Sequence, residues 1–419
     1  MDLQCDQRKP RYIFKETSRS AWSVHDRNSS WKTQQTFRPR TPSNETTVLT
    51  NALVTKLKAL DDIRYHLSWT YGGFIDDIPR RIGTNEALDA AVAALVSAHS
   101  TLASRRVTDG QVSFGSLAKY SYALKTLRLY LNDRSRARKA ETLCAVMLLL
   151  ICQSFLGTHT GCRSAHGEGA AQIIKARSYY DTQDEFECKL LLSLRGPVLF
   201  EALINPKICF GPEEWSSLVA NELDGTSYEG LMMHCLARAP DIMERGRTAL
   251  REQLDLYILA AETRHHYSIL KTTLAKLHDR LYAAPEFSGD DSRQSAVWVT
   301  RTHAYFQRSY GLGLAICLVF NCILKALDAS SVDLDVDSMN FCEEVLSLAD
   351  QAAKYRPLGA SFVTLCLIAA WCASTNLARL QAEIKAILLD YRQDFTATGS
   401  ENLEKELIYS SQRLSLRIS

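Results

Sequence analysis

Apolar residues recur at helical spacing along most of the chain from about residue 45 onward. Segment Glu141–Leu156 is apolar nearly all round, which predicts a helix at the centre of a bundle. By the same periodicity we predict helices over Val48–Leu60, Asn85–Thr101, Phe114–Leu131, Glu141–Leu156, Gly167–Arg177, Asp184–Leu203, Ser295–Leu327, Val336–Tyr355, Gly359–Arg379, Glu383–Thr396 and Leu403–Leu414, with two more inside Leu231–Tyr282.

Particular residues mark the ends of these helices. Thr84 or Asn85 is suited to cap the helix that follows, and Asp337-Ser338 ahead of Glu343-Glu344 predicts a capping signature. Gly196-Pro197 predicts a kink or break because proline removes a backbone donor. Residues 65–83, 205–230 and 284–294 are predicted as loops or loop-rich connections.

The pattern contains no series of alternating strand-like runs bounded by turns. Only 10 Pro and 19 Gly occur in 419 residues, and sheet proteins need more of these turn residues. We therefore predict an all-α fold, a large multi-helix bundle spanning residues 45–419 as one domain.

Residues 1–44 differ from the rest because they lack apolar periodicity. They contain nine basic and four acidic residues, a net charge of +5, and are predicted to be a disordered basic tail. A solvated tail is the favoured interpretation. The alternative is an arm whose Arg8, Lys9 and Arg11 contact DNA or an import receptor.

Charge and hydropathy over the whole chain restrict the partners. The chain has 49 basic and 47 acidic residues, so no global field steers it onto nucleic acid or anionic lipid. The longest apolar stretch, Gly311–Phe320, is followed by Asn321 and Lys325 and is shorter than the ~20 residues of a membrane span. No membrane partner is predicted.

The twelve cysteines lie mostly in apolar runs, as Cys144, Cys152 and Cys317 do. Free cysteine behaves as a small buried apolar residue, and no two cysteines have the C-x2-C spacing that zinc clusters use. His159, Cys162 and His166 share a Gly-rich turn and form the best candidate for metal binding, although a polar loop is favoured. We predict no metal ligand, no cofactor and no disulfide framework.

Other catalytic motifs are incomplete. Asp61-Asp62-Ile63-Arg64-Tyr65 is similar to half of a magnesium-binding aspartate-rich motif, with basic and aromatic residues where further acids belong. Gly311-Leu-Gly313 lies in an apolar run and favours close helix packing over nucleotide binding. We predict no catalytic residue and no enzyme activity.

The densest basic patch is Arg134-Ser-Arg-Ala-Arg-Lys139. Its cationic residues, Arg134, Arg136, Arg138 and Lys139, could contact phosphate groups or an import receptor. Because the patch directly precedes the apolar helix at Glu141, a solvated turn at the start of that helix is the favoured interpretation.

Four segments between about residues 110 and 400 resemble the fungal-specific regulatory domain of Zn2Cys6 (binuclear zinc cluster) transcription factors. They are Ser121-Tyr-Ala-Leu-Lys-Thr-Leu, Glu141-Thr-Leu-Cys-Ala-Val-Met-Leu-Leu, His166-Gly-Glu-Gly-Ala-Ala-Gln-Ile-Ile, and Arg356-Pro-Leu-Gly-Ala-Ser-Phe with Ala369-Ala-Trp371. The resemblance implies a nuclear, pathway- or gene-cluster-specific transcriptional regulator, with secondary metabolism as one field. It also implies contacts with the transcription machinery and allows a homodimer.

The sequence departs from this family at its start. Residues 1–44 contain only Cys5, whereas the family's zinc cluster needs six cysteines. Direct sequence-specific DNA binding therefore does not carry over, and only weak, salt-sensitive or indirect DNA contact is expected. The alternatives are an accessory or scaffold partner of a complete zinc-cluster factor, or an enzyme derived from the same scaffold.

Overall fold

The computed structural model describes residues 44–57, 62–104, 114–157, 165–176, 184–219, 227–283, 293–328, 332–375, 377–395 and 403–417. Ser43–Ser419 form one compact unit. Residues 1–43 of the predicted basic tail, including Arg8, Lys9 and Arg11, lie outside the described residues, as do residues 284–292 of the predicted loop 284–294.

The described residues contain α-helices and short 3-10 helices and no strand, so the predicted all-α multi-helix fold is confirmed. The first half holds α1 (Glu45–Leu57), η1 (Ile63–Tyr65), α2 (Leu67–Tyr71), α3 (Phe74–Asp77), η2 (Ile78–Arg80), α4 (Glu86–Ser104), α5 (Phe114–Leu131), α6 (Arg134–Ala137), α7 (Ala140–Leu156), α8 (Ala165–Ala176), α9 (Glu185–Ile204) and α10 (Pro212–Leu218). The second half holds α11 (Tyr228–Glu252), α12 (Tyr257–Tyr282), α13 (Arg293–Leu327), α14 (Val332–Ala352), η4 (Ala353–Tyr355), α15 (Val363–Ala373), α16 (Ala378–Gln393) and α17 (Leu403–Leu414).

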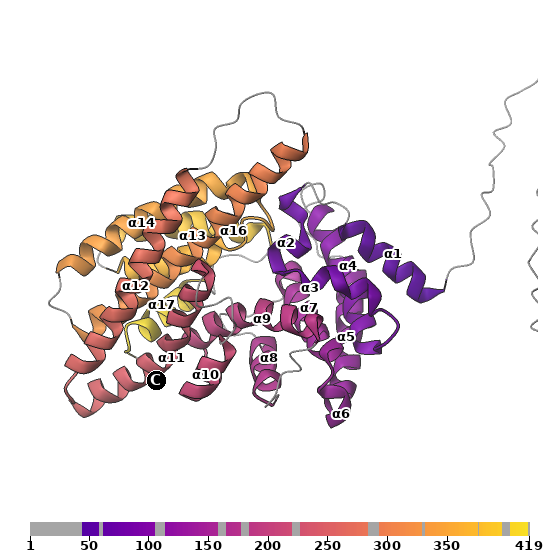
Figure 1. The fold of residues 1–419 in the computed structure, drawn as a ribbon, viewed down its shortest axis with the longest axis horizontal. Coiled ribbons are helices and arrows are strands. Elements are labelled where there is room, and N and C mark those ends of the chain that lie inside the picture. The colour runs from indigo at the N-terminus through magenta and orange to yellow at the C-terminus, as the bar shows by residue number, and fades with distance from the viewer. Residues whose placement is uncertain are drawn as a thin grey trace, which may run out of the picture. The chain divides into compact units, whose positions relative to one another are not determined.

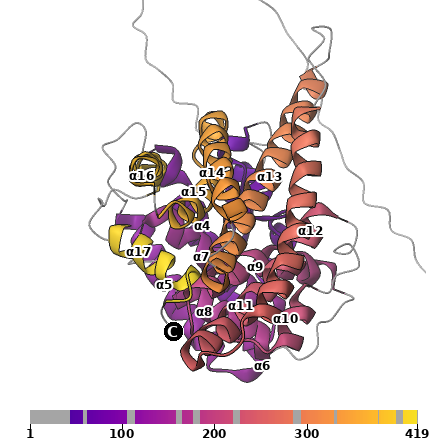
Figure 2. The same cartoon turned by 90° about the vertical axis from the view of Figure 1, so that its left-hand side faces the viewer.

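Two groups of helices each surround their own apolar helix (Figure 1). In the first group, α7 packs against α4, α5 and α8, and its side chains are buried around most of its circumference, as its uniform apolarity predicts. In the second group, α13 contacts α11, α12, α14 and α15, and Figure 2 shows α12, α13 and α14 side by side. Helix α9 joins the groups because it contacts α7 and α8 as well as α11 and α17.

Two local predictions are confirmed at atomic detail. Asn85 caps α4, since its Oδ1 accepts the Leu88 N–H at 3.1 Å. The pair Gly311 and Gly313 serves close helix packing. A Cβ atom on Gly311 would lie 2.7 Å from side-chain carbons of Leu348 and Phe362, and one on Gly313 would lie 3.0 Å from Leu274.

The predicted loops were wrong at two places. Residues 65–83 contain the short helices α2, α3 and η2, held by the buried Phe74, Ile75 and Ile78. Helix α10 lies inside 205–230, and its N-terminus is fixed by the Gly211 N–H, which donates to Glu214 at 2.7 Å. Such short helices span too few turns to show a helical period in sequence.

Of the kink or break predicted at Gly196-Pro197, the break was wrong, because α9 runs without interruption from Glu185 to Ile204, and the kink stays a prediction. The capping signature at Asp337-Ser338 was wrong as well, since α14 begins at Val332. Both side chains make tertiary contacts instead. Asp337 accepts hydrogen bonds from Tyr267 (2.9 Å) and Lys271 (2.7 Å), and Ser338 donates to the Ala373 carbonyl.

The predicted boundary between the helices Gly359–Arg379 and Glu383–Thr396 was misplaced. Turns occupy residues 356–362, α15 ends at Ala373, and α16 already begins at Ala378. The turn holds because the Leu358 N–H donates to the Arg64 carbonyl at 3.0 Å. A long-range backbone contact of this kind leaves no periodic signal in the sequence.

Helix α13 corrects the expectation that no segment reaches the length of a membrane span. Its part Val297–Leu327 is long and apolar enough to cross a bilayer by length and composition. In the structure 83% of its apolar window is buried inside the fold. A helix enclosed by other helices is apolar all round for that reason.

Candidate functional site

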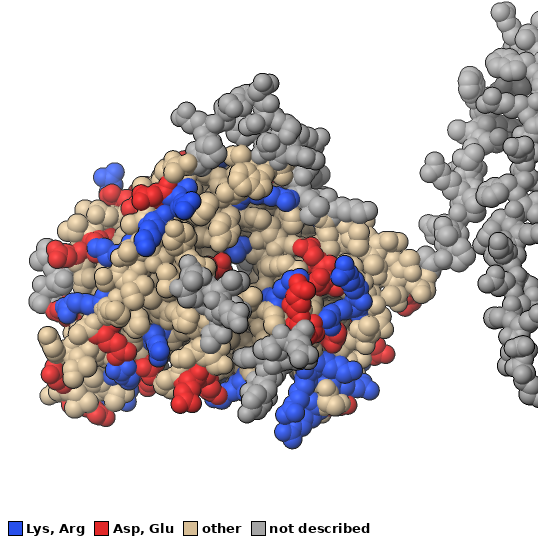
Figure 3. Space-filling view, in the orientation of Figure 1, with Lys and Arg blue, Asp and Glu red and all other residues tan. Residues whose placement is uncertain are grey.

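Exposed basic residues lie along α5, on α6 and directly after α6. Between Phe114 and Lys139 the chain has seven basic residues and one acidic residue, Asp133. All seven side chains are exposed. Figure 3 shows Lys and Arg gathered over the end of the molecule where Figure 1 places α6. We call this the α5–α6 surface, and it consists of Lys119, Lys125, Arg128, Arg134, Arg136, Arg138 and Lys139.

The backbone of α6 is fixed independently of its cationic side chains. Asp133 caps the helix, accepting the N–H groups of Ser135 at 2.8 Å and of Arg136 at 3.3 Å. These bonds and the Ser135 hydroxyl lower the pKa of the Asp133 carboxyl, the hydroxyl having the largest effect. Thr142 on α7 donates to the Arg136 carbonyl at 2.7 Å. Asp133 and Thr142 therefore hold the backbone of α6 in place, while its guanidinium groups are exposed to solvent.

The patch predicted from sequence is the α6 half of this surface. Arg136 is partly engaged, since it lies 3.4 Å from Asp133 and stacks over the Tyr130 ring at 5.1 Å. The patch forms an exposed single turn of helix before α7. This exposure fits both the solvated turn and the phosphate contact, and both stay predictions.

We did not predict from the sequence the α5 half of the surface, which consists of Lys119, Lys125 and Arg128. These residues are spaced at six and three positions, so they do not form a dense basic block. The signal that could have found them is the absence of acid from Phe114 to Asn132. Tyr122 and Leu129 lie among them and are 65% and 63% exposed, so the surface offers apolar contacts beside its charges.

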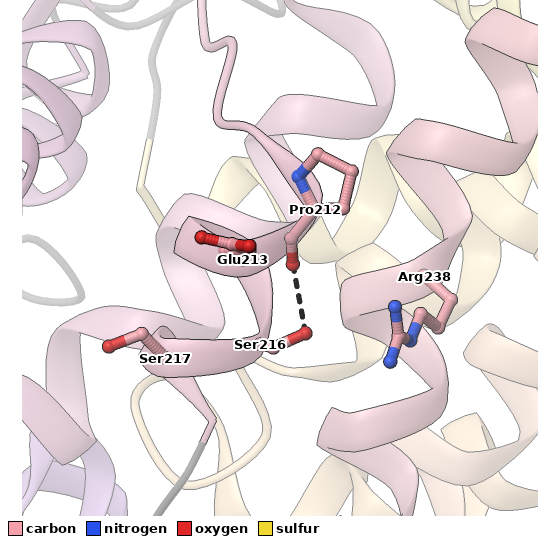
Figure 4. A pocket seen from close by; sticks show the side chains of 5 residues that line it. All are labelled: Pro212, Glu213, Ser216, Ser217 and Arg238. Atoms are coloured by element: carbon pink, nitrogen blue, oxygen red, sulfur yellow. Dashed lines mark hydrogen bonds between the residues drawn. The ribbon is translucent and has the colours of Figure 1, made fainter.

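A second feature is an open pocket of about 500 Å³ between α10 and α11 (Figure 4). Pro212, Glu213, Ser216 and Ser217 line it from α10, and Arg238 lines it from α11. The Ser216 hydroxyl donates to the Pro212 carbonyl of its own helix at 2.8 Å. These five lining residues offer one carboxylate and one guanidinium but no histidine or thiol to act as a general base or nucleophile.

Asp62, from the aspartate-rich segment of the sequence, and the nearby Asp76 and Asp77 form ion pairs or hydrogen bonds, while Asp61 lies outside the described residues. Asp62 binds Arg64 at 2.8 Å, and this hydrogen bond lowers the pKa of the Asp62 carboxyl. Asp76 accepts the Ser68 hydroxyl at 2.5 Å, and Asp77 pairs with Lys189 at 3.0 Å. In the part of the chain that the structure describes, no group of three or more His, Cys, Asp or Glu is placed to hold a metal ion. The side chains of His159, Cys162 and His166 lie outside that part.

Most described cysteines are buried among apolar side chains, as predicted. Of the ten, Cys209 is exposed and Cys188 is half-buried. Burial raises the pKa of the thiols of Cys235, Cys322 and Cys342 to about 12. Since the thiolate is the nucleophile and the metal ligand, we expect these thiols to react slowly in the folded protein.

We expect the thiols to differ sharply in alkylation. At pH 8, iodoacetamide should modify Cys209 readily and Cys322 and Cys366 at least about 100-fold more slowly, because reaching them requires the helices to open. Peptide mapping by mass spectrometry after timed labelling measures each rate, and labelling in urea provides the reference in which all react. Equal rates for Cys366 and Cys209 in the folded protein would contradict the burial.

Comparisons with family models, with curated proteins and with solved structures found no significant match to this chain.

Proposed function

We propose that this protein is a nuclear transcriptional regulator, not an enzyme, and that its α5–α6 surface contacts the phosphate backbone of DNA. The observation that carries the proposal is the separation of charge: the chain is nearly neutral overall, yet residues 114–139 have a net charge of +6 from seven basic residues and one acidic residue. Exposed Lys and Arg clustered on one face are what phosphate recognition requires. The resemblance of residues 110–400 to fungal regulatory domains supports the same function.

The proposed contact is independent of DNA sequence. Lysine and arginine side chains that neutralise phosphates release counterions, so affinity falls with salt. With four to six phosphates engaged, the slope of log K against log salt concentration should be about −4 to −5. Partner proteins of the transcription machinery would supply the sequence specificity that a contact with phosphates alone does not give.

Charge reversal on this surface tests the proposal. The double variant Arg128→Glu/Arg134→Glu should lower affinity for a mixed-sequence duplex at least about tenfold and reduce the salt slope by about 2. The matched control is Lys276→Glu/Arg280→Glu on α12, which changes the net charge equally at exposed positions. Fluorescence anisotropy over a salt series measures both quantities.

The cellular test uses the same pair of variants. Deleting the gene should change the transcripts of a pathway, the control should restore them, and the α5–α6 variant should not. Equal DNA affinity of the two variants would refute the phosphate contact. Restoration of transcripts by both variants would refute its role in regulation.

A further inference from the structure

Two arginines are buried where the last turns of α11 and α17 approach one another. Arg247 on α11 exposes 5% of its surface and Arg413 on α17 exposes 3%. The approach is close, since a Cβ atom on Gly246 would lie 2.8 Å from the side chain of Leu416. Arginine is almost never buried this deeply without a partner, so the pairing of the Arg247 guanidinium needs an explanation.

The guanidinium of Arg247 is only partly paired. Its Nη1 donates to Glu244 Oε2 at 2.9 Å, but the Glu244 side chain is 70% exposed, so solvent screens this ion pair. Its Nε and Nη2 atoms are buried and have no hydrogen-bond partner. These two atoms form one edge of the guanidinium, the edge that binds a carboxylate or phosphate through two parallel hydrogen bonds.

The surroundings of Arg247 disfavour its charge. Burial lowers the pKa of the group most, and the positive charge of Arg413 lowers it further. Arginine nevertheless stays protonated in proteins. A buried water molecule could accept from Nε and Nη2 but would bring no negative charge, whereas removing the partner of a buried cation is strongly destabilising.

We propose that α11 and α17 form a binding site for an oxyanion, a carboxylate or phosphate group held by the Nε–Nη2 edge of Arg247 beside Arg413. Glu244 marks the side of the site nearest to solvent. The site shares no residue with the α5–α6 surface. Its test is therefore independent of DNA binding.

The probes are inorganic phosphate and acetate, compared with sodium chloride at equal ionic strength, in thermal unfolding of the full chain. A probe at ten times its dissociation constant should raise Tm by about 2 °C, and chloride should not. Whichever of the two gives the larger rise identifies the phosphate or the carboxylate as the preferred group. No rise with either probe beyond that of chloride would overturn the proposal.

Two variants separate anion binding from a structural role. Arg247→Met should abolish the anion-dependent rise and leave Tm without anion unchanged or higher, because it removes a poorly paired buried cation. Arg245→Met is the matched control: this exposed neighbour pairs with Asp241 and Glu262, and the variant should keep the full rise. If Arg247→Met keeps the rise, or lowers Tm equally with and without anion, the guanidinium is neutralised within the chain and the proposal is wrong.

Discussion

Replacing Phe320 with alanine is expected to lower the free energy of unfolding by about 3–5 kcal/mol. Phe320 lies in α13 and is 0% exposed, and α13 contacts α11, α12, α14 and α15. Removing the ring deletes its transfer free energy and leaves a cavity that packed helices fill only in part. Urea unfolding followed by circular dichroism measures the loss.

Trp298→Ala is the matched control because Trp298 lies in the same helix and is 65% exposed. Its effect should stay within about 0.5 kcal/mol. If Phe320→Ala prevents folding, Phe320→Leu offers a milder test, with an expected loss of about 1.5 kcal/mol. Similar small losses at Phe320 and Trp298 would mean that α13 is not enclosed by the other helices, and its apolar composition would then need another explanation.

Long helices were predictable from the sequence because a buried helix has apolar residues at most of its own positions. Segment Glu141–Leu156 is apolar on every side, and the structure places it as α7 at the centre of its group of helices. The cysteines followed from the same reasoning, since Cys144, Cys317 and Cys366 sit between apolar neighbours and are 0% exposed. Both inferences need only the residues within a few positions along the chain.

Features that depend on distant residues were not predictable. Asp337 has the sequence context of a helix cap, but it lies in the second turn of α14, where Tyr267 and Lys271 on α12 bind its carboxylate. Arg247 and Arg413 are separated by more than 160 positions, and nothing in the sequence indicates that they approach one another. Local propensity is a weak prior wherever tertiary contacts compete with it.

The α5–α6 surface is an intermediate case. Its α6 half was found because four cationic residues fall within six positions. Its α5 half has equal exposure but lower density along the chain, and folding places the two halves on consecutive helices that contact each other. A count of acids over a helix length, in place of a search for dense basic runs, would have found both halves.

A substitution at Gly359, in the turn before α15, is the second change that we expect to lower stability strongly. Gly359→Ala should destabilise the protein by about 2 kcal/mol or more, because the added Cβ atom would lie 2.8 Å from the Tyr355 carbonyl oxygen and 3.0 Å from that of Ile63. These are backbone atoms of η4 and η1. They cannot move aside without breaking the Leu358 to Arg64 hydrogen bond that joins the turn to the first half of the chain.

Gly169→Ala in α8 is the control with the opposite expected sign. A Cβ atom there would meet nothing within 4 Å, so alanine should stabilise the helix by about 0.5–1 kcal/mol. Thermal unfolding of both variants beside the unmodified protein measures the difference. A fall in Tm for Gly359→Ala with a rise for Gly169→Ala would show that close backbone approach, and not glycine as such, sets the residue at 359. Shifts of the same sign and size would mean that the contact between the turn and η1 is looser than the distances to Tyr355 and Ile63 require.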